Sequence, residues 1–321
     1  MRLQLVQDFE ELEESVRIAW NAIVADNNYS PFSSAGYAAA WISAFGDILP
    51  PQIYLAFAGS NLIGVAPLML EEGILKFIGG GMYDDTSDYC DFVVRNEFEY
   101  EVMPLFIEAL TAHGKYLLDQ VPSRSKTLDF FQERDDSSRT SLIKLPGSWE
   151  DYLRLLQAGD RKDVLYYLNK LSRDFPDATY SITQKSDLGK TAEQLLSFHQ
   201  KVWSEKGEGF FGLDEKGRRS VQFVRGLVEK IPEKIRISSV KRQDELFAMN
   251  FGFVDGSTVY HYLAVTNPEK KAYSPGKVLL ANDIQTAIRE GLICFDFMRG
   301  SDPYKNRFGV VWDSNKRVAH V

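Results

Sequence analysis

Helix-like and strand-like segments follow one another in the same order twice along this chain of 321 residues. Each half has amphipathic helical segments, a strand hairpin, a further strand, and then a last helix and strand. In the first half, two apolar runs at residues 53–58 and 62–70 flank the turn Gly59-Ser60-Asn61, which is typical of a hairpin. The repeated order predicts an α/β fold made of a duplicated unit, although α/β domains of other kinds share much of this order.

Local signals place several boundaries in the first half. Residues 10–25 have the spacing of an amphipathic helix, and Ser33 or Ser34 is the expected N-cap of a second helix that ends at Phe45. A further strand is expected at residues 89–94, because apolar residues dominate that run.

A turn-forming run divides the halves. Pro146-Gly147-Ser148 precedes a helical region at residues 152–173 that is interrupted near Gly159. We therefore expect an N-terminal domain at residues 1–146 and a C-terminal domain at residues 147–321.

Charge and composition exclude some classes of protein. The formal net charge is −8, which argues against a protein that binds bare duplex DNA but allows a nucleotide-containing cofactor. We expect no metal site, since the Cys and His residues have no zinc-ligand spacing, and buried thiols rather than a disulfide for Cys90 and Cys294. Because there is no signal-peptide pattern and no apolar run of membrane-spanning length, the expected location is the cytoplasm, without membrane insertion.

The last third of the chain carries the strongest functional signal. Tyr273-Ser274-Pro275-Gly276-Lys277 opens a helical run that ends at Gly291, and an apolar strand at residues 293–298 follows. The loop after that strand supplies three basic side chains: Arg299, Lys305 and Arg307. A helix N-terminus with a nearby lysine favours an anion, so this order predicts a phosphate site. The simpler alternative is a serine cap with proline in the first turn and no ligand.

These residues resemble the signature of the CelD-like acetyltransferases, a branch of the Gcn5-related N-acetyltransferase (GNAT) superfamily that is similar to the Fem-type peptidyltransferases. The matching motifs of the second half are Tyr273-Ser274-Pro275-Gly276, Phe295-Asp296-Phe297-Met298-Arg299-Gly300 and Tyr304-Lys305. Those of the first half are Trp41, Phe45-Gly46, Pro67-Leu68, Gly79-Gly80, Asp84 and Asp88-Tyr89-Cys90-Asp91-Phe92. The likeness covers nearly the whole chain.

The resemblance implies two tandem GNAT-like domains, each a mixed, mostly antiparallel sheet flanked by helices, with the catalytic geometry in the C-terminal one. Such proteins move an acyl group onto an amine, and family members act in exopolysaccharide and cell-envelope pathways. Fem-type relatives take the acyl group from aminoacyl-tRNA rather than from coenzyme A. The usual glycine-rich cofactor loop is absent here, and Ser274-Pro275-Gly276 stands in its place.

Residues for the donor and for the chemistry are predicted in the second half. The expected donor-binding residues are Ser274, Gly276, Lys277, Arg299 and Tyr304, and the expected catalytic residues are Lys305, Tyr262, Asp296 and His261. Lys305 would place a fixed cation at the reacting centre or on a diphosphate. Asp296 alternates with two phenylalanines, so its side chain faces away from theirs and would serve as a base or as a structural carboxylate. Tyr260 and Tyr262 share one face of a strand and His261 takes the other, where packing is the ordinary role of such residues.

Acceptor-binding residues are predicted in both halves. A glycine-led acidic loop contains Asp84, Asp88 and Tyr89, and it lacks the ligand pattern of a calcium loop. His199 and Trp203 are four residues apart on one helix, so they share a face that either lines a pocket or packs in the core.

The sequence therefore predicts an N-acyltransferase that uses acyl-CoA and acts on an amine of a small, sugar-linked or amino-acid acceptor by direct attack. The first alternative is an aminoacyl-tRNA-dependent transferase, in which basic residues such as Arg161 and Lys162 contact tRNA. The second is a binding protein that kept the fold without catalysis. The oligomeric state is left open by the sequence.

Overall fold

The computed structural model describes residues 1–81, 83, 85–203 and 210–321. Two compact units make up the chain, whereas the sequence places one boundary between residues 146 and 147. The first unit comprises Met1–Arg139, Gln222–Ile231 and Asp313–Val321, and the second comprises Thr140–Val221 and Pro232–Trp312. In the described part of the chain, no helix is long and apolar enough to cross a membrane.

The first unit contains a mixed sheet in the order β1-β2-β3-β4-β6-β13. Neighbouring strands are antiparallel except β4 and β6, which are parallel. Its strands are β1 (Arg2–Val6), β2 (Pro51–Ala58), β3 (Asn61–Glu71), β4 (Ile74–Phe77), β5 (Val93–Val94), β6 (Tyr116–Pro122), the start of β7 (Asp135–Lys144) and most of β13 (Val311–His320). Its helices are α1 (Glu14–Asp26), α2 (Ala35–Phe45), α3 (Glu99–His113) and the second half of α7 (Glu215–Lys230).

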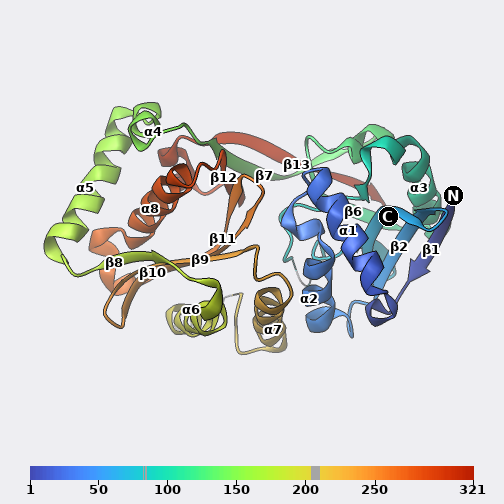
Figure 1. Cartoon of the computed structure of the whole chain (residues 1–321), viewed down its shortest axis with the longest axis horizontal. Helices are drawn as coiled ribbons and strands as arrows, with labels where there is room; N and C mark the ends of the chain where they lie inside the picture. Colours follow the sequence, from blue (N-terminus) through green and yellow to red (C-terminus); the bar gives the residue numbers. More distant parts are fainter. Residues whose placement is uncertain (82, 84, 204–209) are drawn as a thin grey trace. The chain divides into compact units, whose positions relative to one another are not determined.

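The second unit contains strands in the order β8-β9-β10-β11-β12, with the end of β7 beside β12. Its strands are β8 (Thr179–Ile182), β9 (Ile235–Arg242), β10 (Glu245–Asp255), β11 (Thr258–Thr266) and β12 (Cys294–Arg299), and its helices are α4 (Trp149–Leu155), α5 (Ala158–Asp174), α6 (Leu188–Trp203), α8 (Pro275–Arg289) and the start of α7. The pair β11 and β12 is parallel, and the other pairs are antiparallel. Helix α8 packs on one face of these strands with α5 against it, while α6 covers the other face (Figure 1).

The two units repeat one topology. Each has an outer strand, two helices, three antiparallel strands, a helix, and then a strand parallel to the last of the three. The duplicated α/β unit predicted from the sequence, with a mixed and mostly antiparallel sheet in each copy, is therefore confirmed.

Local sequence signals predict the ends of some helices and strands correctly and those of others incorrectly. Ser34 accepts a hydrogen bond from the Tyr37 amide, so the second of the two expected N-cap residues is the cap of α2. The first helix begins at Glu14 rather than at residue 10, because a 3-10 turn at Phe9–Glu11 precedes it. The strand expected at residues 89–94 is reduced to Val93–Val94, where its backbone pairs with β3.

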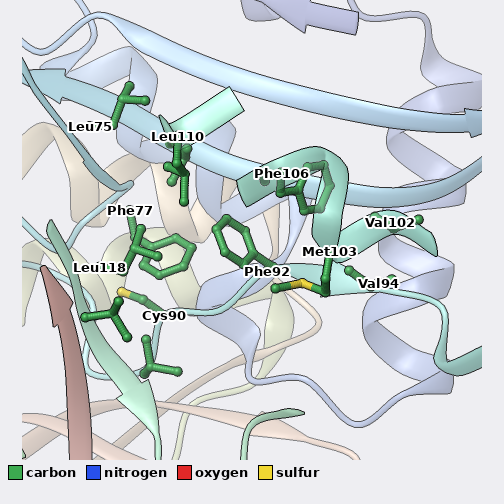
Figure 2. Close-up of a cluster of buried hydrophobic side chains, with 14 of the residues drawn as sticks. Leu75, Phe77, Cys90, Phe92, Val94, Val102, Met103, Phe106, Leu110 and Leu118 are labelled. Atoms are coloured by element: carbon green, nitrogen blue, oxygen red, sulfur yellow. The ribbon is translucent and has the colours of Figure 1, made fainter. Parts of the chain in front are cut away.

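An aromatic and aliphatic core holds the first unit together. Phe92 lies between Phe77 and Phe106, with ring centroids 5.0 and 5.3 Å apart, respectively (Figure 2). Cys90 is buried in the same cluster, as a small apolar residue would be. The corresponding core of the second unit joins α8 to the strands through Val259, Leu280, Ile284, Phe295, Phe297 and Phe308.

A buried carboxylate of α8, that of Asp283, makes a pH-dependent contribution to stability. Asp283 accepts hydrogen bonds from the Tyr180 hydroxyl (2.8 Å) and the Ser238 hydroxyl (3.0 Å). Burial nevertheless raises its pKa from 3.8 to about 6. Between about pH 4 and pH 6 the native state thus holds a proton that the unfolded state has lost, and this contribution to stability falls as pH rises through the window.

Replacing Asp283 by Asn should remove this dependence. From pH 4 to pH 7, we expect the free energy of unfolding of Asp283→Asn to rise by about 3 kcal/mol relative to that of the wild type. The reason is that each unit by which the pKa is shifted is worth about 1.4 kcal/mol. Urea denaturation at a series of pH values measures the difference, with Asp244→Asn in an exposed turn as the control. Parallel pH profiles for Asp283→Asn and the wild type would show that Asp283 is ionised in the native state throughout this range.

Candidate functional site

The parallel strands β11 and β12 stop pairing partway along their length. Their register covers only Thr258–Tyr260 against Cys294–Asp296, yet β11 continues to Thr266 and β12 to Arg299. Helix α8 connects the two strands and therefore begins at the end where they part (Figure 1). Ligands of sheets with parallel strands bind at the carboxyl ends of those strands, so this end of the second unit is the candidate site.

Asp296 shapes the point at which β12 turns away. Its Oδ1 accepts a hydrogen bond from the Met298 amide at 2.6 Å, and Met298 has a left-handed backbone with φ 59°. The register of β12 against β7 shifts between the same two residues. These observations give the buried Asp296 carboxylate a structural role. This is one of the two roles predicted from the sequence, the other being that of a general base.

Lys305 is buried, and its ammonium binds the main chain of the preceding loop. The side chain is 2% exposed, and Nζ donates to the carbonyls of Phe297 (3.0 Å), Met298 (3.4 Å), Arg299 (2.7 Å) and Gly300 (3.1 Å). Asp302 lies 4.0 Å from the same nitrogen. An ammonium enclosed in this way cannot reach a donor diphosphate without breaking the loop. These contacts give Lys305 a positioning role in the loop, and its predicted contact with a phosphate stays a prediction.

His261 and Tyr262 point to opposite faces, as the strand alternation predicts. The His261 ring lies 6.1 and 6.0 Å from those of Phe295 and Phe297, whereas the Tyr262 ring lies 5.4 Å from that of Phe253. Burial, and secondarily the charge of Lys305, lowers the pKa of His261 to about 3. Its imidazole is therefore neutral at physiological pH and too weakly basic to be an efficient general base. Among the described residues, Nδ1 of His261 has no hydrogen-bond partner.

The start of α8 differs from a simple serine cap. Ser274 has a left-handed backbone with φ 45°, and its side chain makes no cap hydrogen bond within the described structure. Its carbonyl accepts from the amides of Lys277 (2.9 Å) and Val278 (3.1 Å), and Pro275 has no N–H to offer. The Cβ of a residue in place of Gly276 would lie 3.0 Å from Cγ2 of Thr266. This helix start thus offers few backbone donors for a ligand.

The charged and polar side chains near this helix start already have internal contacts. The Lys277 ammonium pairs with Asp163 and lies 4.6 Å from the ring centroid of Tyr167. NH1 of Arg307 lies 3.6 Å from the same carboxylate. Tyr304 follows in the loop after β12, and burial, with Asp302 nearby, raises the pKa of its hydroxyl to about 12, so it keeps its proton at neutral pH. Arg299 is half-buried at the end of β12.

The predicted acceptor residues fall in both units. Asp88 is buried and its carbonyl accepts from Nδ2 of Asn315 (2.7 Å), while Tyr89 is half-buried beside Phe32, both in the first unit. Asp84 lies outside the described residues. His199 and Trp203 stack in the second unit with centroids 5.7 Å apart, and burial lowers the pKa of His199 to about 4. The role of each of these residues in binding an acceptor stays a prediction.

Sequence reasoning missed Asp163 and Tyr167. Their spacing of four residues places them on one face of α5, which is a readable signal for a shared contact. The sequence has no signal for their contact with Lys277, because that depends on how α5 packs against α8. No cluster of metal-binding side chains occurs in the described ranges.

Residues 159–306 match the family model described as an acetyltransferase (GNAT) domain, a range that contains Asp163, β11, α8 and Lys305. Over this range the chain is similar to a GNAT domain. A search of curated proteins finds no match.

Solved structures extend the likeness to the whole chain. A crystal structure of FemX aligns with a TM-score of 0.63 and 11% identity, covering 100% of this chain and 97% of that one. The structure of L-PGS from Bacillus licheniformis aligns with a TM-score of 0.62 and 13% identity, covering 96% of this chain and 91% of that one. At such identities the likeness concerns the fold alone.

Proposed function

We propose that the second unit is an N-acyltransferase whose donor places a phosphate near the start of α8 and its acyl end where β11 and β12 part. The observation that supports this most directly is the end of the parallel pairing at Tyr260 and Asp296, on the same side as the start of α8. In this proposal an extended donor chain lies along β11 and β12 beyond the end of their register. The first donor candidate is acyl-CoA, and the acceptor is an amine of a small, sugar-linked or amino-acid compound.

The reaction proposed is direct transfer without a covalent enzyme intermediate. The acceptor nitrogen attacks the acyl carbon, a C–N bond forms, and the C–S bond to the thiol breaks. One amine proton leaves to water, and the departing thiolate takes a proton from water. Backbone donors of β10 around Phe251 to Phe253, where its register with β11 shifts, would bind the acyl oxygen. Lys305 contributes by holding the loop that carries Tyr304.

Aminoacyl-tRNA is the second donor candidate. Two observations favour it: the start of α8 has few backbone donors for a diphosphate, and the fold aligns with FemX over the whole chain. In this case the bond that breaks is the ester C–O bond of the aminoacyl group. The net charge of −8 opposes tight binding to RNA, so contacts would be confined to a local basic surface.

Calorimetric titration with acetyl-CoA, a longer acyl-CoA and a short RNA hairpin ending in CCA tests the proposal. We expect saturable binding of one donor class, weakened about fivefold or more by Lys277→Ala because a phosphate contact is lost. Lys271→Ala removes the same charge from an exposed lysine nearby and should bind as the wild type does. Failure of all three ligands to bind the wild type, in a protein that melts cooperatively, would count against a transferase and favour the non-catalytic alternative.

A further inference from the structure

Asp163 of α5 lies where two cations meet beside the start of α8. Its carboxylate pairs with Lys277, from the first turn of α8, and with Arg307, from the 3-10 helix Pro303–Phe308. We propose that Asp163 is a specificity residue of the donor site, which holds both cations in the free protein and releases them to a donor phosphate. This inference rests on the proposed function and deepens it, because it assigns the residue with which the donor competes.

The charge pattern of α8 supports this role. The first turn of α8 has no acidic residue, although the positive end of the helix dipole favours a negative charge there. Asp163 supplies that charge from a different helix. In the free protein the Asp163 carboxylate therefore supplies the negative charge at the start of α8 that a bound phosphate would supply.

The contacts of Lys277 indicate that it would remain available without Asp163. Its side chain is 16% exposed and its ammonium lies over the ring of Tyr167, which is an attraction independent of Asp163. Asp163 itself is 31% exposed, so the pair is only partly screened by water. A phosphate that binds Lys277 must replace this carboxylate, and the replacement weakens the binding of any donor that has no further contacts.

Asp163→Asn keeps the size of the side chain and removes its charge. We expect this variant to bind donor phosphate about fivefold more tightly than the wild type, since one ion pair no longer competes. Calorimetric titration should use inorganic pyrophosphate for the shared chemistry, and acetyl-CoA and the CCA-ended RNA hairpin to distinguish the two sources of phosphate. Asp177→Asn removes a carboxylate from the exposed pair with Arg242 and serves as the matched control.

The sign of the change separates the possible roles. Tighter binding by Asp163→Asn, with a smaller gain when Lys277→Ala is also present, supports the assignment. Weaker or unchanged binding, while Lys277→Ala still weakens the wild type, overturns it and makes Asp163 a residue that positions Lys277. If neither the wild type nor Asp163→Asn binds any of the three probes, the donor site itself is wrong and the assignment falls with it. Thermal melting monitored by circular dichroism confirms that each variant is folded.

Discussion

The Lys305→Met variant is expected to lose roughly 3 kcal/mol in the free energy of unfolding. Methionine has a similar volume, but it cannot donate to the carbonyls of Phe297, Met298, Arg299 and Gly300, which Lys305 binds in the buried loop. Without the ammonium, these carbonyls stay buried away from water but no longer have the hydrogen bonds that compensate for this burial. Urea denaturation followed by circular dichroism measures the loss.

Two comparisons make this prediction specific. Lys190→Met removes an exposed lysine of α6 and should change the free energy of unfolding by less than about 0.5 kcal/mol. Lys305→Met should also weaken donor binding, since the loop that carries Tyr304 would lose its anchor. If Lys305→Met is as stable as the wild type but does not bind donor, the result would support the direct phosphate contact predicted from the sequence.

The order of helices and strands could be predicted because hydrophobic period and turn chemistry are local. Gly59-Ser60-Asn61 joins β2 and β3 as expected, and Gly59 has the positive φ, 62°, that its turn requires. The helix start at Ser148 is also local, since its hydroxyl accepts from the Asp151 amide at 3.1 Å. The strand expected at residues 89–94 was too long, because an apolar run shows burial and does not show which backbone groups pair.

The candidate site was predictable in position but not in its contacts. Strand alternation assigned His261 and Tyr262 to opposite faces, and their ring contacts agree with this. The carbonyl contacts of Lys305 were not predictable, because a lysine after a strand has the same appearance in sequence whether it faces a ligand or main-chain carbonyls. The partner of Lys277 was missed for a related reason, since Asp163 lies 114 residues earlier in the chain.

Gly252→Ala is expected to destabilise the protein by roughly 3 kcal/mol, because the added methyl group cannot be accommodated by a side-chain movement. A Cβ at this position would lie 2.2 Å from the carbonyl oxygen of Tyr260 and 3.2 Å from Nδ2 of Asn250. The first of these atoms belongs to the main chain of β11, so the central strands must separate. Urea denaturation, compared with the wild type, measures the effect.

The same substitution tests whether the register shift between β10 and β11 serves the proposed chemistry. Pairing of β10 with β11 shifts register between Phe251 and Phe253, and a shift of this kind leaves backbone groups outside the ladder. Movement of β11 at Tyr260 would also displace the point where β11 and β12 part, so donor binding should weaken together with stability. Gly189→Ala, at an open position of α6, should leave stability unchanged or raised by about 0.5–1 kcal/mol. If Gly252→Ala matched that control, the two strands would be able to separate at little cost, and the close approach at Tyr260 would not define the site.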